Sequence, residues 1–195
     1  MIFARSRAAL PRLVFAAALL VSGTALAGPK EDMLALSKKF LALRSYHVTM
    51  ISSDKRVPKT EMDFVAPDRY RMDSPPMGAQ YMIGDTMYMT VDGRTMRIPM
   101  PKGMVSQWRE PTRVFREVNA LQIEALGTEA VNGKPAKKYR FAQSGAQATS
   151  TLMWVGADGY PIKMETSGGA GKRAYTMTMF YSRFNDPSIK IDIPK

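Results

Sequence analysis

The most distinctive chemistry in this chain belongs to methionines spaced two residues apart. Met87 with Met89, and Met177 with Met179, each place two thioethers on one face of an extended segment. Thioethers are soft ligands that favour Cu(I), so a methionine-rich copper site is one interpretation. Methionine is also unbranched and polarizable, and it fills irregular apolar space. The same residues therefore suit an ordinary core or a cavity for a flexible apolar ligand.

Residues suited to catalysis are scarce. His47 is the only histidine, and the chain has no cysteine and no Gly-x-Ser-x-Gly nucleophile elbow. The carboxylates Glu61, Asp63 and Asp73 fall on the polar phase of extended segments, where contact with solvent explains them, and His47 should face away from Tyr46. We therefore expect no enzymatic activity and no cofactor, and we assign no residues to a metal.

The elements that must hold the methionines show alternation with a period of two. Between Tyr46 and Met100 apolar and polar residues alternate, which is typical of strands with one buried face. The apolar positions are Tyr46, Val48, Met50, Met62, Phe64, Tyr70, Met72, Tyr81, Ile83, Met87, Met89, Met96, Ile98 and Met100. Turn signals such as Gly84-Asp85 and Asp92-Gly93 separate them. Six successive strands of this kind predict an antiparallel sheet.

The second half of the chain adds five more strands, for about eleven in total. They are predicted over residues 124–131, 136–142, 149–155, 162–166 and 175–182. The chain then ends with Ile189, Ile191 and Ile193 alternating with polar residues.

Helices are predicted at two places. Before the first strand, one apolar stripe is formed by Met33, Leu36, Phe40 and Leu43. Between the two sets of strands, we expect a turn of helix around residues 104–108 and a short helix from Pro111 to about Asn119, because proline suits the first helical position. Residues 102–119 are called the lid below.

The first 27 residues have the features of a cleavable secretory signal. A basic stretch with Arg5, Arg7 and Arg12 precedes a short apolar run, and Ala25-Leu26-Ala27 fits a signal-peptidase site. An uncleaved anchor is the alternative, but the apolar run is short for a membrane span. We expect export to the periplasm as a soluble, monomeric single domain of residues 28–195.

Charge narrows the expected partners. The net charge of the full sequence is +11, and the chain stays basic without the three arginines of the signal. In an exported protein this balance favours anionic lipid head groups or acidic partners, and we expect no nucleic acid. A basic surface that serves solubility alone is the other reading.

The order of helix, six strands, helical insertion and five strands resembles the LolA-like periplasmic lipoprotein carriers and the outer-membrane lipoprotein-sorting proteins. Similar local segments occur at residues 45–50, 66–72, 82–88, 127–133, 152–155, 158–161, 184–185 and 193–194. The resemblance implies an α+β, mainly antiparallel fold: an unclosed half-barrel with helices covering its concave face. It also implies a cavity that binds the acyl chains of a lipid or lipoprotein. The protein would carry this ligand toward the outer membrane, and envelope membrane proteins would be further partners. Some domains of this kind are sensor or interaction modules, which is a second alternative.

Alternation and resemblance together predict the site. The expected cavity residues are Tyr46, Val48, Met50, Met62, Phe64, Tyr70, Met72, Met87, Met89, Met96, Met177 and Met179. The expected lid residues are Met104, Trp108, Val114 and Phe115.

The chain departs from the family at one position of mechanistic interest. The carriers have an arginine immediately before the proline of the 66–72 segment, and this arginine holds the helical lid shut. Ala66 stands there in this chain. Arg69 and Arg71 are the nearest candidates to replace it.

Overall fold

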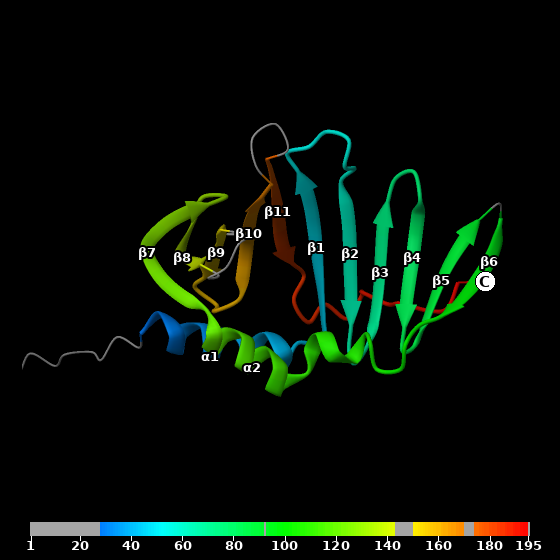
Figure 1. Cartoon of the computed structure of the whole chain (residues 1–195), viewed down its shortest axis with the longest axis horizontal. Helices are drawn as coiled ribbons and strands as arrows, with labels where there is room; N and C mark the ends of the chain where they lie inside the picture. Colours follow the sequence, from blue (N-terminus) through cyan, green and yellow to red (C-terminus); the bar gives the residue numbers. More distant parts are fainter. Residues whose placement is uncertain (1–27, 92, 143–149, 170–173, 195) are drawn as a thin grey trace, which may run out of the picture.

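The computed structural model describes residues 28–91, 93–142, 150–169 and 174–194 (Figure 1). The predicted signal segment lies outside these ranges. So do Asp92, the predicted start of a strand at Thr149, and residues 170–171 of a glycine-rich turn.

One antiparallel sheet of eleven strands dominates the described chain. The strands are β1 (Ser45–Ser52), β2 (Thr60–Val65), β3 (Arg69–Ser74), β4 (Gly78–Ile83), β5 (Thr86–Val91), β6 (Arg94–Pro99), β7 (Gln122–Val131), β8 (Lys134–Ala142), β9 (Ser150–Gly156), β10 (Pro161–Gly168) and β11 (Tyr175–Ser182). Their order is β6-β5-β4-β3-β2-β1-β11-β10-β9-β8-β7, so β6 and β7 form opposite edges. The sheet is therefore an unclosed barrel, as predicted from the sequence.

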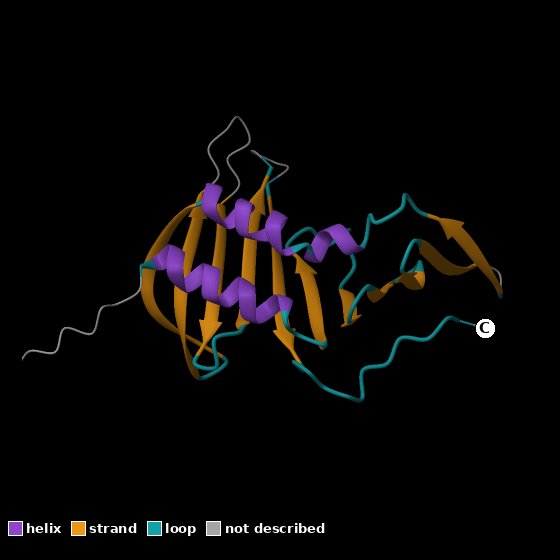
Figure 2. Ribbon diagram, turned by 90° about the horizontal axis from the view of Figure 1, so that it is seen from below, coloured by secondary structure: helices purple, strands orange, loops and turns teal. Residues whose placement is uncertain are grey.

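The helices lie together on one face of the sheet (Figure 2). They are α1 (Pro29–Leu41), the 3-10 helix η1 (Ser106–Arg109) and α2 (Pro111–Ala120). The topology requires this placement. The chain runs outward from β1 to the edge strand β6, and it must then reach the opposite edge before β7 can begin. The predicted helical insertion is the segment that makes this crossing.

Charge and capping stabilise both helices. In α1, acidic residues lie in the first turn and basic residues in the last, which suits the helix dipole. In α2, the Glu110 carboxylate accepts hydrogen bonds from the backbone N–H groups of Thr112 (2.9 Å) and Arg113 (2.6 Å). These bonds keep the pKa of Glu110 below its usual value. The two helices run antiparallel, and Lys30 Nζ donates to the carbonyl of Asn119 at 2.8 Å.

Methionines face one another across four neighbouring strands on the side of the helices. Met50 lies opposite Met179, Met179 opposite Met164, and Met164 opposite Met153, from β1 through β11 and β10 to β9. Neighbouring strands lie about 4.8 Å apart. The four flexible, polarizable thioether side chains therefore form one row across the sheet, which is called the methionine row below.

The main core lies between the sheet and the end of α1. Its buried members are Leu43, Tyr46, Val48, Phe64, Tyr70 and Val105. Aromatic rings connect them: Tyr46 lies 4.8 Å from Phe40 and 4.9 Å from Phe64, and Phe64 lies 4.9 Å from Tyr70, between ring centroids. A second cluster, beneath the start of α1, contains Met33, Tyr139, Phe141 and Val155.

One local expectation differs from the structure, and the C-terminal segment adds buried residues without a strand. In β4 it is Met82 that faces the helices, because the register pairs Met82 with Tyr70; Tyr81 pairs with Arg71 on the outer face. The terminal isoleucines form no strand, yet Ile189 and Ile191 are buried, and Arg69 Nη1 donates to the carbonyl of Ile191 at 2.8 Å. Within the described ranges, no helix has the length and apolar character needed to cross a membrane.

Candidate functional site

An apolar cavity of about 420 Å³ lies between the helices and the middle of the sheet. We call it the main cavity. Residues from α1, the lid and several strands line it: Leu36, Ser37, Phe40, Leu41, Tyr46, Met62, Tyr70, Met72, Met82, Trp108, Arg109, Val114, Met153, Pro161 and Tyr181. The space is open to solvent on one side and its walls are mostly carbon and sulfur, as in sites for apolar ligands.

A second apolar cavity of about 230 Å³ lies next to the first beneath α1. The two share Leu36, Ser37 and Met153 as lining residues, and we call the second one the adjoining cavity. Val118 and Leu121 enclose it from the side of α2, while Phe141, Thr151 and Met164 belong to strands. The two spaces lie side by side along α1, the main cavity near its C-terminal end and the adjoining cavity nearer its start, and together they are called the hollow.

Half of the expected lid residues and a third of the expected cavity residues line the main cavity in the structure. Those that line it are Tyr46, Met62, Tyr70, Met72, Trp108 and Val114. Trp108 is 45% exposed and packs edge-on against Tyr70, with ring centroids 5.3 Å apart, so it covers one end of the cavity.

The other predicted site residues do not line the main cavity. Val48 and Phe64 are buried in the core beneath it, and Met50 and Met179 pack against that core. Six more lie elsewhere: Met87, Met89, Met96, Met177, Met104 and Phe115. Alternation could not make this distinction, because all strand residues of one phase share a face whether or not a helix leaves space above them.

Arg109, at the end of η1, is charged, and the other described residues that line the main cavity are not. Its Nη2 atom donates to the backbone carbonyls of Phe40 (2.9 Å), Leu41 (2.7 Å) and Leu43 (3.3 Å), where α1 ends. Its Cζ atom lies 4.2 Å from the centroid of Phe64, within cation–π distance. Arg109 therefore joins the lid to the last turn of α1.

Tyrosines surround this guanidinium. Burial raises the pKa of Tyr46, because the phenolate would be poorly solvated, and the positive charge of Arg109 opposes that shift only in part. Burial likewise raises the pKa values of Tyr70 and Tyr181. These hydroxyls stay protonated at neutral pH and supply polar, uncharged groups beside the cavity.

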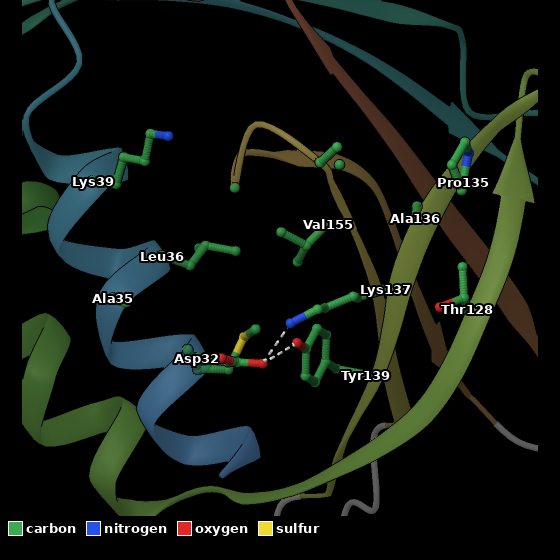
Figure 3. A pocket seen from close by; sticks show the side chains of 14 residues that line it. Asp32, Ala35, Leu36, Lys39, Thr128, Pro135, Ala136, Lys137, Tyr139 and Val155 are labelled. Carbon is green, nitrogen blue, oxygen red and sulfur yellow. Dashed lines mark hydrogen bonds and ion pairs between the residues drawn. The ribbon is translucent and has the colours of Figure 1, made fainter. Parts of the chain in front are cut away.

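A third cavity, of about 430 Å³, lies between α1 and strands β8 and β9 (Figure 3). One wall is polar: Asp32 Oδ2 accepts hydrogen bonds from the Tyr139 hydroxyl (2.5 Å) and from Lys137 Nζ (3.3 Å). Leu36 of α1 also lines this cavity, as it lines the other two. One helix thus forms a wall of all three spaces.

The only histidine lies on the outer face, as predicted. His47 Nδ1 is 2.8 Å from Asp63 Oδ1, and its Nε2 is 3.1 Å from Glu61 Oε2. None of the three cavities is lined by these side chains. Within the described residues, no group of three or more histidine, cysteine, aspartate or glutamate side chains is arranged to hold a metal ion.

The sequence and the fold were compared with known proteins, and similar structures were found. No family model matches the sequence, and no curated protein matches it. The lipoprotein LppX of Mycobacterium tuberculosis matches at TM-score 0.60 and 15% identity, over 85% of this chain and 100% of that chain. LprF from Mycobacterium bovis matches at TM-score 0.59 and 13% identity, over 86% of this chain and 96% of that chain. At such identities the likeness establishes the fold. This chain has the fold of LppX and LprF.

A LolA superfamily protein from Nitrosomonas europaea also matches, at 11% identity and TM-score 0.34, over 86% of this chain and 96% of that chain. That score is too low to support any argument about shared detail.

The lid contacts α1 through an arginine that the sequence did not single out. Arg71 bonds to Asp73 at 2.7 Å on the outer face, and Arg69 bonds to the C-terminal segment. Arg109 makes the contact with α1 from the lid. The structure therefore shows neither Arg69 nor Arg71, the two candidates to replace an arginine at position 66, bonded to a helix.

Sequence reasoning missed several residues of the site. Leu36 and Phe40 belonged to a recognised helical stripe, but the stripe could not show that space remains beneath it. Met82 was assigned to the wrong phase of its strand. Arg109 gave no signal, because an arginine in a polar loop is ordinarily solvated.

Proposed function

We propose that this protein is a periplasmic carrier or chaperone that binds acyl chains of a lipid or lipoprotein and moves them toward the outer membrane. The observation that carries the proposal is the apolar hollow beneath α1, formed by the main and adjoining cavities. A sheet whose inner face served only as a core would be packed at high density against its helices.

The chemistry of the walls supports a flexible apolar guest. Met62, Met72, Met82 and Met153 line the main cavity, and unbranched thioethers adapt to ligands of different shape. Each methylene removed from water contributes roughly 0.8 kcal/mol, so a chain of a dozen methylenes would supply on the order of 10 kcal/mol before the costs of binding. Burial of hydrocarbon would therefore offset much of the cost of binding a chain that is otherwise exposed to water.

The location rests on the predicted signal segment, and the direction of transport rests on the resemblance to lipoprotein carriers. The periplasmic location and the direction of transport are therefore parts of this proposal. Envelope membrane proteins that deliver the ligand to the carrier and take it from the carrier are a further part.

Co-purification tests the proposal. The full chain, expressed with its own leader in a bacterium with two membranes, is purified from the periplasm, extracted with organic solvent and examined by mass spectrometry. We expect acyl lipids in near-stoichiometric amount, and less in Met153→Trp, where an indole occupies the space shared by both cavities. Absence of lipid from the wild type, together with failure to displace a fluorescent fatty acid probe, would reject the carrier function.

Copper binding is the alternative function, because the methionine row places four thioethers close together. Its four thioethers come from neighbouring strands that hold them side by side in a row, rather than around a central point. We therefore expect no tight stoichiometric Cu(I) site when the protein is titrated against a competing chelator. A one-to-one complex that survives the chelator, and that is lost in Met164→Leu, would favour copper.

A further inference from the structure

We propose that the ligand of the main cavity carries an anionic oxygen, a carboxylate or a phosphate, at the head of its acyl chain, and that Arg109 binds this oxygen. The inference rests on the proposed function, since it assumes an acyl chain in the hollow, and it adds the chemistry and orientation of the head group.

The first argument is an uncompensated charge. Arginine stays protonated in proteins, so Arg109 brings a full positive charge to an otherwise apolar cavity. Among the residues that the structure describes, no carboxylate lies within ion-pair distance of it. Glu110, the next residue, is bonded to the N-terminus of α2. Charges taken out of water are normally paired, and the cavity is where a partner can enter.

The second argument is an unused donor. Nη2 of Arg109 makes all three hydrogen bonds to the carbonyls at the end of α1. Nη1 is buried and, in the described part of the chain, has no hydrogen-bond partner. Buried donors are almost always satisfied, by protein, water or ligand. The planar guanidinium is also the side chain best suited to carboxylate and phosphate oxygens.

The residues around Arg109 suit the charged head group of a ligand better than they suit the apolar end of an acyl chain. Burial raises the pKa values of Tyr46 and Tyr70, so their hydroxyls stay neutral at physiological pH; the two hydroxyls interact with each other, and that of Tyr46 also interacts with Arg109. Both tyrosines line the main cavity with Arg109. An anionic oxygen here would meet one cation and two hydroxyl-bearing side chains.

The hollow also sets the direction of the tail. From Arg109, at the C-terminal end of α1, the adjoining cavity lies past Leu36, and its strand walls include Phe141 and Met164. None of the described residues that line it is charged. The acyl chain therefore extends from Arg109 toward Met164.

The decisive experiment changes the ligand rather than the protein. Mature wild-type protein is titrated at neutral pH, below the micellar concentration, with dodecanoic acid, dodecyl phosphate and dodecanol, which share one chain and differ at the head. We expect at least one of the acids to bind roughly tenfold or more tightly than the alcohol, the gain typical of a hydrogen bond to a charged group. The ratio of the two acids distinguishes a carboxylate site from a phosphate site.

Each outcome has a separate meaning. Equal binding of all three ligands would overturn the anionic head and leave the carrier function standing. Binding of none would reject the carrier function itself.

A variant assigns the effect to Arg109. In Arg109→Gln the preference for acid over alcohol should fall to within about twofold while dodecanol still binds. The matched control is Arg113→Gln, because Arg113 is exposed on α2 and pairs with Glu117 at 2.8 Å; it should keep the full preference. An unchanged preference in Arg109→Gln would contradict the assignment. If that variant does not fold, the ligand series with the wild-type protein still decides the head-group chemistry.

Discussion

The guanidinium of Arg109 lies 4.2 Å from the ring centroid of Phe64, a residue with no exposed surface. Phe64 belongs to the second strand of the sheet and Arg109 to the lid, so this contact connects the core to the part that covers the cavity. The same arginine bonds to three carbonyls where α1 ends. Arg109 thus joins the middle of the lid both to the core and to the end of α1.

Replacing Arg109 by leucine should loosen the lid locally. The apolar contact with Phe64 is largely kept, but three carbonyls lose their donor, and hydrogen bonds to charged groups contribute about 1.5–3 kcal/mol. We expect backbone amides of η1 and the last turn of α1 to exchange with solvent roughly tenfold faster or more. Hydrogen-exchange mass spectrometry measures this. Arg113→Leu is the control and should leave these amides unchanged; equal exchange in all three proteins would contradict the role of Arg109.

Substitutions at one core position and one cavity-wall position should differ in their effect on stability. Phe64 is fully buried, so Phe64→Ala should lower the free energy of unfolding by about 3–5 kcal/mol. Met72 is half-buried and already borders empty space, so Met72→Ala should cost less than about 1.5 kcal/mol. Urea denaturation gives both values. Similar losses at the two positions would mean that Met72 packs as tightly as the core does.

Filling the far end of the hollow should change the preferred chain length. In Met164→Trp the indole takes up part of the adjoining cavity, so long acyl chains should lose at least about tenfold in affinity while a short chain such as octanoate is little affected. Competition binding with fatty acids of eight to sixteen carbons measures the profile. Met77→Trp, at a position that is 61% exposed, is the control. A loss that is the same for every chain length would indicate that the tail does not extend toward Met164.

One carboxylate gives a pH dependence of stability. Asp186 accepts hydrogen bonds from Ser188 and Arg183, which lower its pKa to about 2. An unfolded aspartate titrates near 3.9. The folded-state pKa is the lower one, so this stabilisation is fully present above about pH 4 and is lost as the pH falls toward 2.

Thermal unfolding of the wild type and Asp186→Asn checks this linkage. The wild type should be the more stable protein at pH 5–7, and the difference should shrink between pH 4 and pH 2. A difference independent of pH over that range would show that the lost hydrogen-bond geometry, rather than the charge, explains the effect.

The sequence predicted the sheet well because alternation is a local property. Tyr46, Met62 and Met72 each lie at the apolar phase of a strand, and all three face the helices in the structure. The turn residues between strands, and Pro111 at the start of α2, placed the element boundaries close to those observed. Met82 was the exception. Residues 81–83 are all apolar, so periodicity could not choose the inner phase until the pairing of Met82 with Tyr70 was known.

By itself, the sequence determined the antiparallel strands, the helical insertion and the methionine-rich inner face, because each follows from residues near one another in the chain; that the sheet is unclosed was implied by the resemblance. Only the tertiary structure decided which inner residues border empty space and which, like Val48 and Phe64, are buried in the core. It alone brought Arg109 from a polar loop to the end of α1. A cavity and the half-buried charge beside it depend on the distance between elements remote in sequence, and alternation along a strand does not encode that distance.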